Sequence, residues 1–165
     1  MNTFTIGQTK HDTALAIALH QNAQIADVRL ARAKAAADRP GTVFQEPIAA
    51  SLSVEAEHVE GPPGHLFIEV SFRLTGTTKQ DEPRGKTAVS VECTFEVTYQ
   101  LKPGFTPTTD QVKAFKDGNA IFNCWPYGRQ YVQDTIQRLG FPPLILPFLR
   151  VQTRHREARK PAKSE

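Results

Sequence analysis

The residues of this chain that could take part in metal or bond-making chemistry are five histidines, two cysteines and two neighbouring glutamates. Metal and catalytic sites need such side chains at short spacings such as HExxH, CxxC or GxSxG, or need a glycine loop for phosphate. The chain has none of these motifs, and its histidines and cysteines are scattered over His11, His20, His58, His65, His155, Cys93 and Cys124. We therefore predict no catalytic residue, no metal site and no cofactor, and a protein that is not an enzyme.

The remaining chemical groups have structural interpretations. Glu55 and Glu57 would share one face of a strand, where carboxylates usually solvate the open side of a sheet. Cys93 and Cys124 are interpreted as buried, reduced thiols of a cytoplasmic protein. The apolar run 14–19 is too short to span a membrane. The polar residues 20–22 that follow it argue against a secretion signal. We expect a cytoplasmic protein without membrane insertion.

Positive charge is concentrated in the last sixteen residues. Residues 150–165 hold six basic and two acidic side chains, whereas the rest of the chain holds 14 basic and 15 acidic ones. The tail has no aromatic residue for base stacking, so we interpret it as a disordered, solubilising terminus and predict no specific nucleic-acid partner. A weak contact with RNA, a membrane or an acidic protein is the alternative. The predicted organisation is a disordered 1–10, one domain over 11–149 and a basic disordered tail over 150–165.

Three runs in the middle of the chain alternate apolar and polar residues. They cover 52–57, 66–75 and 89–101, with turn signals at 61–64 and 76–85. This pattern predicts an antiparallel meander with one buried face. Upstream, 12–21 predicts a helix with Asp12 or Thr13 as its N-cap. Residues 25–34 are ambiguous, because their alanines favour a helix and their alternation fits an edge strand.

The last third of the chain must cover the sheet. A short helix capped at 108–110 is predicted to end near Gly118, and a longer one to run to about Leu139, with an apolar stripe that includes Trp125 and Val132. Pro126 either kinks this helix or occupies its first turn. The predicted fold class is α+β, a four-stranded antiparallel sheet covered on one face by a long C-terminal helix.

The region 119–149 also carries a resemblance to a known family. The run Trp125-Pro126-Tyr127-Gly128-Arg129, followed by Gly140-Phe141-Pro142 and then Leu144 and Leu146, resembles the long helix and Leu-rich segment of SecB-type export chaperones. Thr42 to Gln45, followed by Pro47, resembles the crossover loop of that family, and Thr87 to Glu92 resembles the strand before its long helix. The resemblance covers about residues 25–148 and favours a strand over 25–34.

The resemblance implies an ATP-independent holdase that binds unfolded or precursor polypeptides in hydrophobic grooves and keeps them translocation-competent. It implies a dimer of dimers without a cofactor, with Glu92 at the position that docks the SecA motor. The client-binding residues that it implies are Val43, Phe44, Phe141, Leu144, Leu146 and Phe148. The residues expected at the oligomer interface are Trp125, Tyr127, Gly128, Arg129 and Val132.

Three departures from the family pattern leave other functions open. The chain turns polar and basic from Arg150, where the family continues into a second amphipathic helix; its body is near neutral instead of acidic; and the helix over 12–21 is an addition. One alternative is a dedicated chaperone or adaptor for a single partner, such as an antitoxin, that takes no part in general export. Another is a module that binds a small apolar ligand in a closed pocket.

Overall fold

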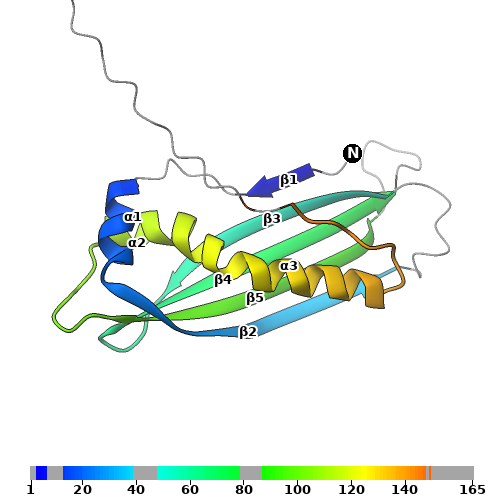
Figure 1. The fold of residues 1–165 in the computed structure, drawn as a ribbon. Coiled ribbons are helices and arrows are strands. Elements are labelled where there is room, and N and C mark those ends of the chain that lie inside the picture. The colour runs from blue at the N-terminus through cyan, green and yellow to red at the C-terminus, as the bar shows by residue number, and fades with distance from the viewer. Residues whose placement is uncertain (1–2, 7–12, 39–47, 79–86, 148, 150–165) are drawn as a thin grey trace, which may run out of the picture.

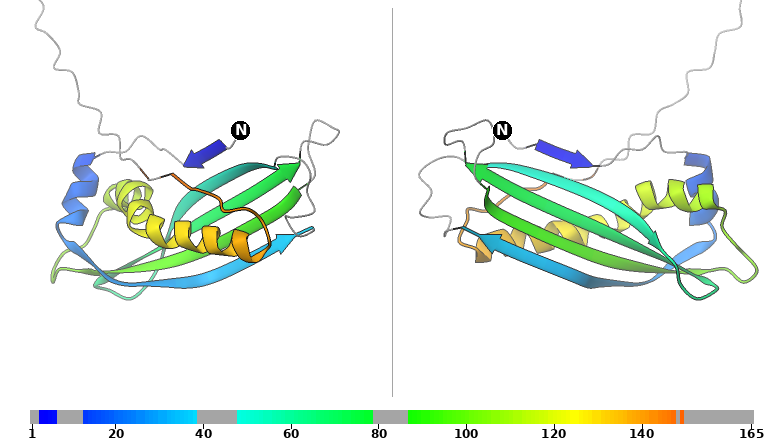
Figure 2. Two further views of the ribbon diagram at one scale, coloured as in Figure 1. Left: turned by 45° about the vertical axis from the view of Figure 1, so that its right-hand side comes forward. Right: turned by 180° about the vertical axis from the view of Figure 1, so that it is seen from behind.

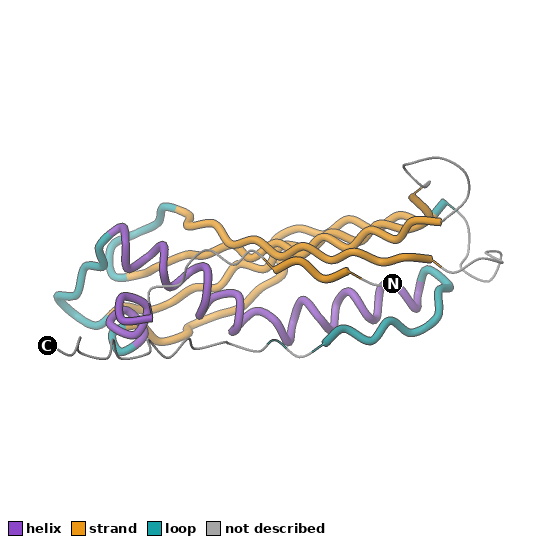
Figure 3. The backbone as a smooth tube through the Cα atoms, turned by 90° about the horizontal axis from the view of Figure 1, so that it is seen from above, coloured by secondary structure: helices purple, strands orange, loops and turns teal. Residues whose placement is uncertain are grey.

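The computed structural model describes residues 3–6, 13–38, 48–78, 87–147 and 149 (Figure 1). In chain order its elements are β1 (Thr3–Ile6), α1 (Thr13–His20), β2 (Ala23–Ala37), β3 (Ile48–Val59), β4 (His65–Thr78), β5 (Thr87–Leu101), α2 (Thr109–Phe115), a π-helical turn η2 (Lys116–Ala120) and α3 (Ile121–Arg138). The sheet forms one layer, and η2, α2 and α3 form a second layer on one of its faces (Figures 1 and 3).

The strands are ordered β1-β3-β4-β5-β2, and all neighbours pair antiparallel except β1, which runs parallel to β3. The predicted α+β fold with a four-stranded antiparallel sheet and a long C-terminal helix is confirmed. The fifth strand was not predicted, and it lies within the segment 1–10 that was expected to be disordered. Four residues are too few for an alternation to predict a strand, and the stretch of β3 that pairs with β1 begins at Ser51, far away in the sequence.

The ambiguous segment is a strand. β2 pairs with β5 from Ala23 to Ala37, and register shifts between Ile25 and Asp27 and between Leu30 and Arg32 leave one extra residue at each place. Each bulge shifts the alternation by one residue. The period of two is therefore broken twice within β2, which explains why the sequence pattern alone was ambiguous. β2 is an edge strand, so it has only one partner, β5, among the described elements.

The alternation of the three central strands separates two faces of the sheet. Cross-strand partners such as Val54, Phe72 and Cys93 lie on the covered face and are at most 2% exposed. The other face, which we call the open face, carries Ser, Thr, Glu and Arg and is seen without a helix in front of it in the right-hand view of Figure 2. Burying a Val, Leu or Phe contributes about 1.5–3 kcal/mol. A slip by one residue would exchange these faces, so the register is strongly set.

The helical cover is continuous from Thr109 to Arg138. It begins with a capping box, in which the Thr108 hydroxyl accepts from the Gln111 N–H (3.3 Å) and the Gln111 side chain accepts from the Thr108 N–H (2.9 Å). The predicted end near Gly118 is wrong, because the π turn carries the helix through this glycine into α3. Pro126 lies inside α3. It removes the hydrogen bond to the carbonyl of Phe122, and both residues lie on the exposed side of the helix.

Helix α1 lies at one end of the sheet, where it packs on α2 (Figure 1). Its predicted existence over 12–21 is confirmed for Thr13–His20, and Asp12 lies outside the described residues. Ala16 and Leu19 are 2% and 0% exposed, so α1 extends the core. The helix ends where the Asn22 side chain donates to the Ala18 carbonyl (2.9 Å).

Candidate functional site

The segment after α3 turns back along that helix without regular structure (Figures 1 and 2). The reversal is a Schellman motif, in which the Gly140 N–H donates to the Gln137 carbonyl (2.9 Å) and the Phe141 N–H to the Ile136 carbonyl (3.2 Å). Gly140 has φ of +79°, a conformation that glycine adopts without penalty. The sequence Gly-Phe-Pro therefore stops the helix and sends the chain back.

Two side chains of α3 hold the returning segment by its backbone. Gln133 Nε2 donates to the Leu144 carbonyl (2.9 Å), and Trp125 Nε1 donates to the Pro147 carbonyl (3.2 Å). The segment contains three prolines and forms neither a helix nor a sheet ladder, so its carbonyls lack backbone donors and side chains can supply them. α3 therefore carries an extended, apolar chain segment, from Phe141 to Pro147, along its flank.

The side chains of this segment divide by alternation. Leu146 is 1% exposed and Phe141 is 8% exposed, both within the core, and Leu144 is half-buried. Ile145, between the two leucines, is 80% exposed. Phe141 and Leu146 therefore serve the core of the protomer, which leaves them little surface for a client.

Val43, Phe44 and Phe148, the other predicted client-binding residues, lie outside the described residues. Two exposed apolar side chains that the prediction did not include are Ile145 and Phe122, the latter 51% exposed on the turn of α3 before Trp125. Leu144, Ile145 and Leu146 are all apolar, so the sequence carried no signal that would single out Ile145. Ile145 and Phe122 are named here the flank residues of α3.

Three of the five predicted interface residues lie against the sheet of their own protomer. Trp125 and Val132 are 4% and 0% exposed. A Cβ added to Gly128 would lie 2.3 Å from the Phe72 ring, so this glycine accommodates an aromatic ring of β4. Trp125, Gly128 and Val132 are therefore core residues of the protomer. Tyr127 is 47% exposed and Arg129 is half-buried, so these two have surface that a partner could contact.

A second apolar surface lies between α3 and β2. Leu30 on β2 is the register partner of Phe95 on β5, and it is 44% exposed. The Phe95 ring lies 6.1 Å from that of Tyr127 and 6.4 Å from that of Tyr131, measured between centroids. We call these four residues the β2-side patch. Helix α3 thus leaves large apolar side chains exposed on both of its sides.

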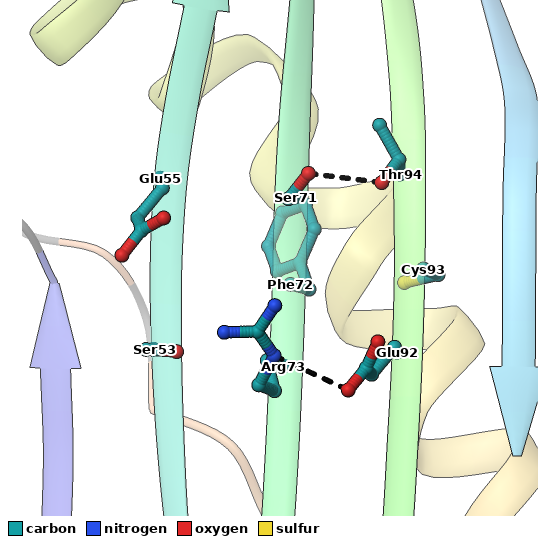
Figure 4. A pocket seen from close by; sticks show the side chains of 8 residues that line it. All are labelled: Ser53, Glu55, Ser71, Phe72, Arg73, Glu92, Cys93 and Thr94. Atoms are coloured by element: carbon teal, nitrogen blue, oxygen red, sulfur yellow. Dashed lines mark hydrogen bonds and ion pairs between the residues drawn. The ribbon is translucent and has the colours of Figure 1, made fainter.

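The open face is polar, and three of its carboxylates, those of Glu69, Glu92 and Glu96, are paired with arginines. Arg29 bonds Glu96 (2.8 Å), and Arg32 bonds both carboxylate oxygens of Glu69, which raises the pKa of Arg32. Glu92, the predicted SecA contact, is half exposed and lies 3.2 Å from Arg73 (Figure 4).

This last pair borders a shallow hollow of about 60 Å³ on the open face, beside a 2.9 Å hydrogen bond between the Ser71 and Thr94 hydroxyls (Figure 4). Arginines on β2 and β4 therefore offset the acidic charge that a basic partner would need on this face.

Within the described ranges, no group of three or more His, Cys, Asp or Glu side chains could hold a metal ion. No helix of the described chain is long and apolar enough to cross a membrane.

Both cysteines are buried free thiols, Cys93 on β5 and Cys124 on α3. Burial raises the pKa of each to about 12, and it raises the pKa of the nearby Tyr99 to about 12 as well. The thiolate is the nucleophilic form of cysteine. Neither thiol of the folded protein is therefore suited to nucleophilic chemistry at neutral pH.

We predict that the two thiols resist alkylation at pH 8 in the folded protein and react rapidly in denaturant. Because their folded pKa lies above the ordinary value of 9.0, the stability they confer is complete below pH 9 and is lost as the pH rises from 9 towards 12. Urea unfolding across this range measures the loss. The double variant Cys93→Ala, Cys124→Ala should show a shallower decline, and an unchanged slope would contradict the assignment.

No family model matches the chain. It is 32% identical over 103 residues to the protein-export protein SecB of Hydrogenovibrio crunogenus, which corresponds to 62% of each chain. The chain thus matches less than two thirds of that relative's length. It is 29% identical over 145 residues to the SecB-like chaperone Rv1957 of Mycobacterium tuberculosis, covering 79% of this chain and 80% of that protein.

A solved structure shares the fold. The structure of Mycobacterium tuberculosis Rv1957 in complex with a ChAD peptide from the HigA1 antitoxin superposes with a TM-score of 0.74 at 24% identity. The match covers 86% of this chain and 100% of that chain. The arrangement of a four-stranded antiparallel sheet and a long C-terminal helix is therefore a known one.

Proposed function

Since the chain is a divergent member of the SecB-like chaperone family, we propose that it is an ATP-independent holdase that binds unfolded or precursor polypeptides and keeps them translocation-competent. The observation that carries this proposal is the exposure of the flank residues, which is 51% for Phe122 on α3 and 80% for Ile145 in the extended segment along it. Exposed apolar surface marks an interaction site where it forms a contiguous patch, and we propose that Phe122 and Ile145 belong to one such patch. Burial of apolar surface stabilises a complex without reading a particular sequence, as a holdase requires.

The β2-side patch supports a second part of the proposal, namely that the protomer assembles as a dimer of dimers. Leu30 and Tyr127 are 44% and 47% exposed, and a second copy would cover both. Several identical client sites on one assembly raise the effective concentration for a long unfolded chain. Size-exclusion chromatography with light scattering should give the mass of a tetramer, and a monomer would contradict this part.

We propose that the protein works in the cytoplasm. If it delivers clients to SecA, Glu92 would be the residue that contacts the motor. The arginine beside this carboxylate weakens the proposal, because a basic partner would have to displace Arg73 or accept a neutralised surface. Client holding and motor docking are therefore separate in this chain. Client holding has the stronger structural support.

A dedicated chaperone for one partner, such as an antitoxin, is the second candidate. It is favoured by the paired charges of the open face and by the antitoxin peptide in the structure of the Mycobacterium tuberculosis relative. Affinity capture from the native cell separates the two. One dominant stoichiometric partner would support the dedicated role, and a broad set of unfolded precursors would support general holding.

We predict that Ile145→Asp or Phe122→Asp weakens the binding of a fluorescent, permanently unfolded protein by about tenfold or more, because each removes an apolar side chain worth about 1.5–3 kcal/mol when buried. Gln130→Asp is the matched control, since it adds the same charge at an exposed polar position of α3. Fluorescence anisotropy gives the affinities and urea unfolding checks stability. Equal affinity for all four proteins would exclude the flank residues as the client site.

A further inference from the structure

The strand β1 stands apart from the rest of the sheet. It is the parallel member of a sheet that is otherwise antiparallel over the described strands. It joins β3 at the sheet edge, with Thr3 opposite Ser51 and Ile6 opposite Val54 (Figure 1). β1 is four residues long and β3 is twelve. Most of the outer edge of β3 thus has no strand partner among the described residues.

The interactions that hold β1 at this edge do not depend on its particular sequence. A strand added to an edge is held chiefly by main-chain hydrogen bonds, which any extended segment can make. The sequence of β1, Thr-Phe-Thr-Ile, alternates polar and apolar residues, and Phe4 and Ile6 are register partners of Leu52 and Val54. These two residues of β3 are 1% and 0% exposed. Any extended segment with alternating apolar residues has the same features.

We propose that the outer edge of β3 is a strand-accepting site for extended, apolar-alternating segments of client proteins, and that Thr3–Ile6 is its internal occupant, which a client displaces. This inference rests on the proposed holding function and deepens it. The edge supplies hydrogen bonds that tolerate any sequence, and the flank residues of α3 supply apolar contacts. A bound client would run parallel to β3, as β1 does.

The internal occupant has a consequence for affinity. A client binds this edge only in the fraction of molecules whose edge is vacant, so its apparent dissociation constant is the intrinsic one divided by that fraction. Holding β1 in place should therefore weaken client binding, and releasing β1 should strengthen it. A short strand that makes few hydrogen bonds is suited to this role because it can be displaced.

The first test locks β1 in place. Thr5 and Ser53 are register partners, and the double variant Thr5→Cys, Ser53→Cys allows a disulfide between them. The native thiols are buried and leave this pair as the reactive one. We expect the oxidised protein to bind fluorescent, reduced and carboxymethylated α-lactalbumin at least about tenfold more weakly than the same sample after reduction. Reduction within one sample controls for folding.

The second test releases β1. Phe4→Pro with Thr5→Pro places a proline in each alternating set of N–H groups, so whichever set faces β3 loses a donor. We expect about threefold or tighter client binding, together with faster amide hydrogen exchange at 51–54 that slows again when client is added. Gln8→Pro with Thr9→Pro is the matched control, because it adds two prolines outside β1, and it should behave as the wild type.

The outcomes separate this inference from the proposed function. If the locked and the proline variants both bind client as tightly as the wild type does, the strand-accepting edge is overturned and the holdase proposal stands. Absence of client binding in the wild type and in every variant would overturn both. Binding that appears only when β1 is released would support the inference most strongly.

Discussion

Replacing Leu146 by alanine is expected to lower the free energy of unfolding by about 2–5 kcal/mol. The side chain is 1% exposed and belongs to the core cluster that joins α3 to the sheet. Its loss removes apolar contacts and leaves a cavity that the segment, fixed by bonds from Gln133 and Trp125, can close only in part. Urea unfolding followed by circular dichroism measures the change.

The neighbouring residue provides the control. Ile145 is 80% exposed, so Ile145→Ala should change the stability by less than about 0.5 kcal/mol. A similar loss in both variants would mean that the segment does not lie along α3 with this alternation. A loss confined to Leu146→Ala would establish that the segment is part of the core and that only one of its sides is available to partners.

Replacing Gly128 by alanine is expected to destabilise the protein by about 1–3 kcal/mol, although alanine favours a helix by about 1 kcal/mol over glycine. The new Cβ would lie 2.3 Å from the Phe72 ring, so the ring must move. That ring is 1% exposed and packs against Trp125 and Phe95 at centroid distances of 6.0 and 6.4 Å. The overpacking should therefore outweigh the gain in helix propensity.

A double-mutant cycle identifies the cause. Phe72→Leu removes the aromatic ring that faces Gly128, so adding Gly128→Ala to it should destabilise by less than the same substitution in the wild type. The expected coupling is about 0.5–3 kcal/mol. Additive effects would show that Gly128 is needed for a reason other than this contact, and an interface between subunits would then be restored as the explanation.

Alternation accounts for the part of the fold that could be predicted. The three central strands carry an unbroken period of two, so their register and their buried face follow directly from the sequence. β2 also alternates apolar and polar residues, but bulges near Ala26 and Ala31 break its period of two. β1 alternates over four residues only, which is too few to predict a strand. The π turn at 116–120 was not predicted, because glycine is typical of a helix end and disfavours a helix interior, so Gly118 indicated a stop.

The candidate site was predicted less well, and the reason is physical. Core residues and client-binding residues are both large and apolar, so composition does not separate Leu146 from Ile145. Only the direction of the segment along α3, set by Gly140 and by two side-chain hydrogen bonds, decides which is buried. Gly128 is a similar case, because a small residue indicates a close approach without indicating what approaches.

The central claim is that this protein holds unfolded chains without ATP, and light scattering by an aggregating client tests it most directly. Chemically unfolded citrate synthase is diluted into buffer with and without the purified protein, in the absence of nucleotide. We predict that scattering is suppressed when the assembly is near equimolar with the client, and that Ile145→Asp suppresses it less than Gln130→Asp does. Scattering that is the same with and without the wild-type protein would contradict the account.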